Sequence, residues 1–142
     1  MYQAAAFNEN TASWNTARVT SMIGVFQGAT VFNQPIGSWN TANVTIMNGM
    51  FLTASAFNQP IDAWNTAKVT SMNSMFFGAN AFNQPIGTWN TSNVTDMAGL
   101  FQGATVFNQP INRWKIACYN TVTSPWPILV DAFRGDRILK KM

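Results

Sequence analysis

The sequence predicts an α/β repeat solenoid, with one short parallel strand and one short helix in each turn. Two observations predict this fold class: one motif recurs at a fixed spacing, and each copy passes from a helical to a strand-like pattern of apolar residues. A period between 20 and 50 residues is typical of stacked repeats. The tryptophans mark the period, 25 residues apart without insertion or deletion: Trp14, Trp39, Trp64, Trp89 and Trp114.

The M-x-x-L-F segment of each copy predicts a helix of about eight residues. Thr95 precedes this segment in the fourth copy at a good N-cap position, and Gly103 falls where the helix should stop and where positive φ is common. Thr53 replaces this glycine in the second copy. The apolar residues of the fourth copy follow the i, i+3, i+4, i+7 spacing of one helix face: Met97, Leu100, Phe101, Ala104 and Phe107.

The next segment, I-G-x-W-N-T, is too short for a helix and predicts a strand. Ile86, Trp89, Thr91 and Val94 fit the L-x-x-L-x-L spacing of leucine-rich repeats. Alternate residues of a strand point to opposite sides, so Trp89 and Thr91 should face the core while Asn90 faces outward. Stacked copies would then form a parallel sheet.

The chain divides into two regions, residues 1–114 with the repeats in register and residues 115–142 with a divergent pattern. Alignment on the tryptophans places Met1 where Phe26 stands, so the array starts in mid-repeat. Its first repeat lacks a dedicated cap, and we expect it to be a surface for self-association. After Pro127 the apolar residues suit an amphipathic helix, which we expect to cap the last repeat.

Charge is scarce in the repeats and concentrated at the C-terminal end. Residues 1–112 carry two basic and three acidic side chains, whereas residues 113–142 carry six basic and two acidic ones. A nucleic-acid-binding array would need basic residues along one face of the repeats, so we expect no nucleic-acid partner. The chain shows no signal peptide and no apolar run of 18 residues, so we expect no membrane insertion.

The residue types required for catalysis and metal binding are missing or isolated. The chain has no histidine and one cysteine, Cys118, and its few carboxylates occupy different repeat positions. We therefore predict that the protein is not an enzyme and holds no metal or cofactor. The repeated methionines and tryptophans have the spacing of core residues, which we favour over a metal site or a sugar-stacking platform.

The outward side of the predicted strands is the candidate binding face. It is flat, uncharged and made of small residues, without the aromatic and arginine anchors of binding hot spots, so each contact should be weak and many repeats should act together. The alternative is that the asparagine rows serve only to stack the strands. The residues of this face are Ser38, Asn40, Ala42, Asn65, Thr88, Asn90 and Ser92.

The run W-N-T-S-N-V-T-D-M-A-G-L-F-Q-G-A-x-x-F-N-Q-P-I, at residues 89–111, resembles the repeat of BspA-like bacterial surface proteins. The resemblance covers residues 1–114. It implies a leucine-rich-repeat-like solenoid that is secreted or at the cell surface and that adheres to other proteins. That family has an aliphatic residue where Thr91 stands, so the inward threonines of this chain need hydrogen-bond partners.

Three functions are therefore expected in order of preference. The first is a non-catalytic module for cell-surface display or adhesion, with extracellular or cell-surface proteins as partners. The second is ice- or crystal-surface binding by threonine and asparagine ladders, which requires a hydroxyl row on the surface. If Thr41 and Thr66 point inward as predicted, their row is not available for it. The third is end-to-end self-assembly through the first repeat.

Overall fold

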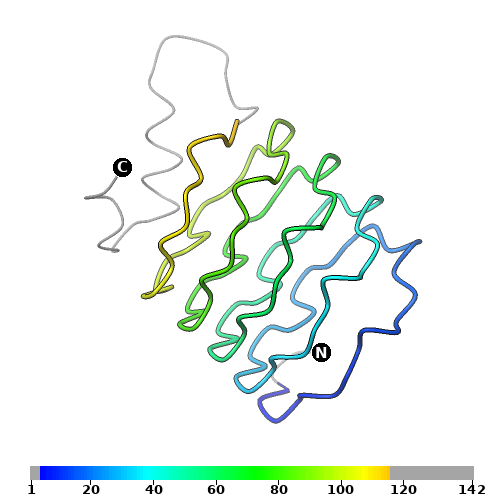
Figure 1. Cartoon of the computed structure of the whole chain (residues 1–142), viewed down its shortest axis with the longest axis vertical. Helices are drawn as coiled ribbons and strands as arrows, with labels where there is room; N and C mark the ends of the chain where they lie inside the picture. Colours follow the sequence, from blue (N-terminus) through cyan, green and yellow to red (C-terminus); the bar gives the residue numbers. More distant parts are fainter. Residues whose placement is uncertain (1–3, 116–142) are drawn as a thin grey trace.

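The structure is a computed structural model that describes residues 4–115. Consecutive 25-residue coils stack along one axis, from the blue N-terminal coil to the orange end of the described chain (Figure 1). Residues 4–115 contain no helix, and their β-structure is limited to isolated parallel bridges. These bridges pair Ser21 with Ile46, Ile46 with Ser71, and Ser71 with Asp96. The predicted α/β solenoid with one helix and one strand per turn is therefore wrong.

The segment predicted to be helical forms consecutive turns, at residues 23–28, 48–53, 73–78 and 98–103. Its alternate backbone amides donate to the following coil instead of to their own segment. The Met22 amide donates to the Ile46 carbonyl and the Phe26 amide donates to the Met50 carbonyl, both at 2.9 Å. An α-helix would keep these N–H groups within itself. The isolated bridges lie at the start of this segment, so coil-to-coil pairing occurs where the sequence predicted a helix.

Two residues with positive φ in every coil explain why the helical pattern does not produce a helix. In the first coil they are Gly24, with a φ of 60°, and Gly28, with a φ of 72°. A left-handed residue interrupts a right-handed helix, and two of them four positions apart leave no room for a regular turn. The prediction of positive φ at Gly28 and Gly103 is confirmed, but these residues shape tight turns and do not end a helix.

The close spacing of the coils is the second reason. Phe26, Phe51, Phe76 and Phe101 come from the predicted helix, and their ring centroids lie 5.5 to 5.6 Å apart from one coil to the next. Neighbouring helices pack with their axes 8–10 Å apart. Coils stacked at the spacing of these rings can accommodate turns on this side but not helices.

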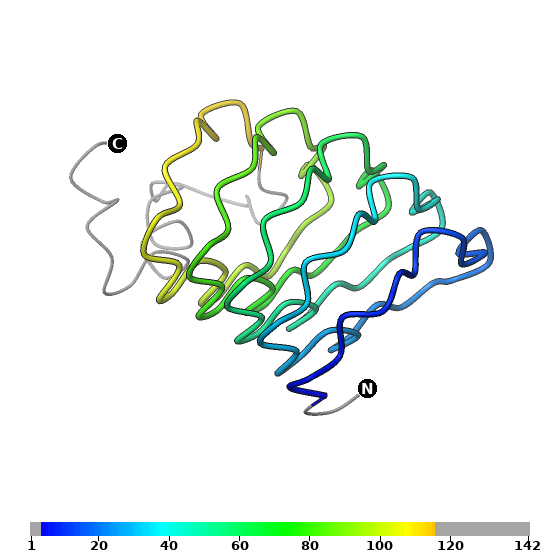
Figure 2. The same ribbon diagram turned by 60° about the horizontal axis from the view of Figure 1, so that its bottom comes forward.

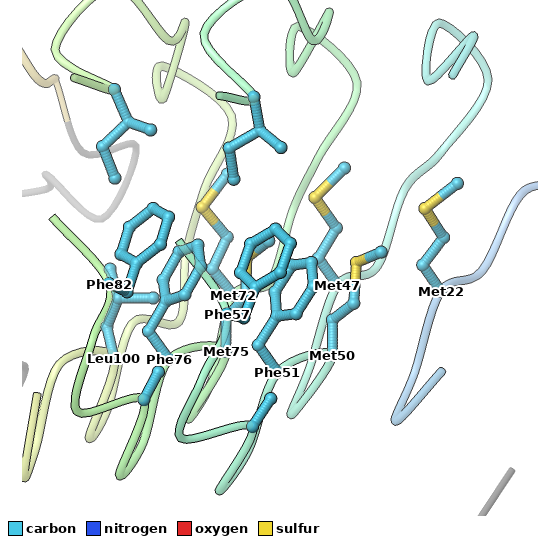
Figure 3. Close-up of a cluster of buried hydrophobic side chains, with 14 of the residues drawn as sticks. Met22, Met47, Met50, Phe51, Phe57, Met72, Met75, Phe76, Phe82 and Leu100 are labelled. Carbon is cyan, nitrogen blue, oxygen red and sulfur yellow. The ribbon is translucent and has the colours of Figure 1, made fainter. Parts of the chain in front are cut away.

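Aromatic columns run through the core along the stacking axis. The column that begins at Phe7 has ring centroids 5.8 to 6.0 Å apart, and the tryptophan column has centroids 6.0 to 6.4 Å apart. Within a coil, Phe51 and Phe57 lie 4.0 Å apart, and Figure 3 shows Met47 and Met50 beside them. Both methionines are fully buried. The prediction that the repeated methionines and tryptophans form the core is confirmed for the coils inside the stack.

A row of threonines is buried beside the tryptophans, as the sequence predicted. Thr41 and Thr66 are each 1% exposed, and their hydroxyl groups donate to the backbone carbonyls of Asn65 and Asn90 at 3.0 Å. The Trp64 indole N–H likewise donates to the Ile36 carbonyl of the preceding coil, at 3.0 Å. The buried hydroxyl and indole groups therefore connect adjacent coils, which provides the partners that burial requires.

Equivalent turns of successive coils line up in rows along the stack (Figure 2). The first coil, residues 7–31, lies at one end, and its Trp14 is 45% exposed. The expectation of self-association through this repeat stays a prediction. Residues 116–142, with most of the predicted divergent region and its capping helix, lie outside the described residues.

Candidate functional site

The predicted binding face is exposed, but it is not the side of a sheet. Its residues lie in and between two turns, which occupy residues 37–38 and 42–43 in the second coil and the equivalent positions elsewhere. Ala42 is half-buried and the other six are exposed. The strand that was expected to present them is absent among the described residues, so the face is a row of corners.

The asparagines of this face hold their own turns. The Asn40 side-chain oxygen accepts from the Ala42 amide at 3.1 Å, and that of Asn90 accepts from the Ser92 amide at 3.0 Å. Such local bonds are typical of asparagine in turns. These side chains therefore do not form the stacking ladder that was considered as an alternative function.

A different asparagine row connects the coils. The Asn33 side-chain oxygen accepts from the Asn58 amide at 3.0 Å and from the Gln59 side-chain amide at 3.1 Å. The same contacts recur one coil later, where the Asn58 side chain receives the Asn83 amide. The sequence predicted that this row would bond its own bend. Its bonds instead join successive coils, which leaves the corners free of a stacking role.

One hollow on the surface lies at the corner row, where three successive coils contribute side chains. It has a volume of about 380 Å³ and we call it the corner groove. Thr88 is the member of the predicted face that lines it, and the other predicted residues lie outside it. The groove is lined by Asp62, Pro85, Gly87, Thr88, Pro110, Asn112 and Arg113.

The glycine in the groove is required by the stacking of the coils. A Cβ at Gly87 would collide with the Pro110 carbonyl oxygen, and one at Gly37 would lie 2.7 Å from the Pro60 carbonyl oxygen. The corner therefore packs most easily with no side chain at this position. Because Gly87 adds no side chain, the surface dips between Asp62 on one coil and Asn112 two coils later.

The groove carries one charge of each sign. Asp62 and Arg113 are both exposed and stand two coils apart, which places them about 10 Å apart along the axis if each coil adds about 4.8 Å. The residues at the equivalent positions in the other described coils are uncharged. They are Ala12, Gly37, Gly87 and Asn112 in one row and Ser13, Ser38, Ala63 and Thr88 in the other.

Sequence reasoning missed Asp62 and Arg113 as members of one site. They occupy neighbouring repeat positions two copies apart, so their proximity depends on how the corners stack. The available signal was their departure from the repeat: an acid stands where two copies have glycine, and a cation stands among serine, alanine and threonine. In a strict repeat, a residue that breaks the pattern at an exposed position is a candidate for function.

Two further classes of site were searched for in the described part of the chain. Among residues 4–115, no three side chains of histidine, cysteine, aspartate or glutamate gather closely enough to hold a metal ion. No helix with the length and hydropathy of a membrane span occurs in this range either. The groove thus offers apolar proline surface, a hydroxyl, an amide and two opposite charges as its means of recognition.

The repeats match the family described as Mycoplasma protein of unknown function, DUF285, over residues 1–72 and 35–126. The two matches overlap and together run from residue 1 to residue 126 of the 142. The chain belongs to this family. No curated protein and no solved structure matches the sequence. Since the DUF285 description assigns no activity, the function of this DUF285 chain has to be argued from its surface.

Proposed function

We propose that this DUF285 chain is a non-catalytic repeat module that binds proteins at a cell surface, in display or in adhesion. The observation that carries the proposal is the periodic corner surface. Every coil places small polar side chains on the same exposed turns, above a core of fully buried aromatic and aliphatic residues. The resemblance to BspA-like repeats supports the same role and a secreted or cell-surface location.

The corner side chains are held in place before any partner arrives. The Asn65 side-chain oxygen accepts from the Ala67 amide at 3.0 Å, and the Ser92 hydroxyl donates to the Asn90 side-chain oxygen at 2.7 Å. Side chains that are already ordered lose little conformational freedom on binding. Each corner is nevertheless small and has no aromatic anchor, so affinity should come from several coils acting together.

Binding to immobilised extracellular-matrix proteins tests the proposal. The intact chain is compared with longer chains that carry one, two or four extra copies of residues 57–81. The apparent affinity should rise by at least about tenfold across the series because added coils add contacts without a new entropic penalty for association. Interferometry on a panel of matrix proteins measures it.

The matched control places like charges on the corners. Ser38→Glu and Ala63→Glu change exposed side chains outside the aromatic columns, so thermal stability should stay within about 0.5 kcal/mol of the parent. Binding should be lost. If no member of the panel binds even the longest array, the adhesion proposal is wrong.

A second candidate is binding to ice or another crystal surface, and one observation favours it. The Thr45 and Thr70 hydroxyls donate to the carbonyls of Thr20 and Thr45, each at 3.1 Å. Thr20, Thr70 and Thr95 are exposed, so this is a hydroxyl row with the spacing of the coils, distinct from the buried row of Thr41.

Ice-recrystallisation inhibition tests the second candidate. Inhibition by the parent chain should be abolished by Thr70→Lys, which puts a strongly hydrated charge into the middle of the row. The control is Thr88→Lys, on a different row. Absence of inhibition by the parent chain would remove this candidate.

A further inference from the structure

We propose that the corner groove binds an extended peptide segment of a partner protein, in the polyproline II conformation, with a basic side chain at one position and an acidic side chain three residues away. The basic side chain pairs with Asp62 and the acidic one with Arg113. The inference rests on the proposed function in protein binding and names the chemistry of the partner.

The first argument is that stacking does not require these two charges. Position 62 is one where the neighbouring coils have glycine, and the Cβ of Gly37 or Gly87 would press on a proline carbonyl oxygen. An aspartate here is thus unfavourable or neutral for packing. Arg113 stands where the other described coils have serine, alanine or threonine. Both residues are exposed, so neither charge is held by the core.

The second argument is the distance between the charges. Two coils at about 4.8 Å each place Asp62 and Arg113 about 10 Å apart along the axis. A polyproline II helix has three residues per turn and rises about 3.1 Å per residue, so residues i and i+3 share one side at about 9.3 Å. In a β-strand, residues i and i+3 point to opposite sides, so the strand conformation fits less well.

The third argument is the surface between the charges. Pro85 and Pro110 form an apolar floor in the groove, against which the rings of a proline-rich segment can pack. The backbone carbonyls of a polyproline II segment have no internal partners. The Thr88 hydroxyl and the Asn112 side-chain amide line the same groove and are able to donate to them.

The test uses the intact chain and labelled peptides that contain Lys-Pro-Pro-Glu, read out by fluorescence anisotropy at low and high salt. The parent chain should bind this peptide better than Lys-Glu-Pro-Pro, which has the same composition and the wrong spacing. Since exposed ion pairs are weak, each charge should contribute about two- to fivefold in affinity, and salt should reduce the difference.

Charge reversal turns the proposal into a change of specificity. Asp62→Arg should prefer Glu-Pro-Pro-Glu, and Arg113→Asp should prefer Lys-Pro-Pro-Lys, each by about fivefold or more over the mixed peptide. The control Lys68→Gln removes an exposed charge outside the groove and should leave all three affinities unchanged. Asp62→Gly restores the residue that packs best here, so it should fold at least as stably as the parent and lose the preference for lysine.

The result that overturns the inference is a parent chain that does not distinguish the two spacings, or reversal variants that keep the parent specificity. The same variants are measured on the matrix-protein panel. Retained matrix binding without peptide selectivity rejects the groove while the adhesion proposal stands, whereas loss of matrix binding by the parent chain rejects the adhesion proposal itself.

Discussion

The first coil, residues 7–31, and the third coil, residues 57–81, carry the same motif and differ in burial. Trp14 is 45% exposed while Trp64 is 3% exposed, and Phe7 is half-buried while Phe57 is fully buried. The residue types are the same, so the difference comes from their neighbours. An interior coil is covered on both sides, and the motif by itself provides only part of its own core.

The first coil is also asymmetric in its hydrogen bonds. Bonds that run to the following coil are made as in the interior: the Gly24 amide donates to the Asn48 carbonyl at 3.0 Å, as the Ser74 amide does to the Ala98 carbonyl at 2.9 Å. A polar group that belongs to the other side is less well placed. The Thr11 hydroxyl is buried without a partner, at the position where the later coils have isoleucine.

The largest expected effect separates an interior ring from an end ring. Phe76→Ala should lower the free energy of unfolding by about 3–5 kcal/mol, because it leaves a cavity in a fully buried column. Phe7→Ala should cost about half of that, since its ring is already partly in water. Urea unfolding with a shared m-value measures both. Equal costs would mean that burial at the end of the stack is as complete as in its middle.

Removal of the buried hydroxyl at the end of the stack should stabilise the protein. Thr11→Val keeps the shape of the side chain and removes the unpaired group, so the free energy of unfolding should rise by about 1–2 kcal/mol. Thr11→Ile should do at least as well, since it recreates the interior motif. The reciprocal change Ile61→Thr should destabilise the third coil by a similar amount. A neutral Thr11→Val would show that the hydroxyl is solvated.

The buried threonine row should show no difference between end and interior, because its bonds run to the following coil. The Thr16 hydroxyl donates to the Asn40 carbonyl at 3.1 Å and the Thr66 hydroxyl donates to the Asn90 carbonyl at 3.0 Å. Thr16→Val and Thr66→Val should each cost about 0.5–1.5 kcal/mol. Calorimetry of both variants measures the pair, and a clearly cheaper Thr16→Val would place the end effect on both sides of the first coil.

The smallest effect reverses the comparison, because the tight turns are less strained in the first coil. It has glycine at both positive-φ positions, whereas the second coil has Thr53, with a φ of 58°, and the third has Ser74, with a φ of 54°. Thr53→Gly and Ser74→Gly should each stabilise by about 0.5–1 kcal/mol, the left-handed penalty less the entropy of glycine. Ala63→Gly, where φ is not positive, should destabilise by about 0.5–1 kcal/mol. Destabilisation by Thr53→Gly would contradict the assignment of strain.

The corner groove shows where prediction from sequence reached its limit. Thr88 was predicted to be exposed and available, and it lines the groove. Asp62 and Arg113 were visible as charges, but the sequence could not show that corners two copies apart form one hollow. That depends on the small rise per coil and on the missing side chain of Gly87, which are properties of the stack.

The sequence by itself determined the period of 25 residues, the aromatic and methionine core, the inward threonine row and the positive φ of Gly28 and Gly103. These follow from repetition, hydrophobicity and the conformational freedom of glycine. Only the tertiary structure decided the backbone conformation around Phe26. Its apolar spacing is that of a helix, but rings 5.6 Å apart in adjacent coils are too close for packed helices, and the alternate amides bond to the next coil. Helical spacing places side chains on one face, and a chain of tight turns between close-packed coils satisfies the same requirement.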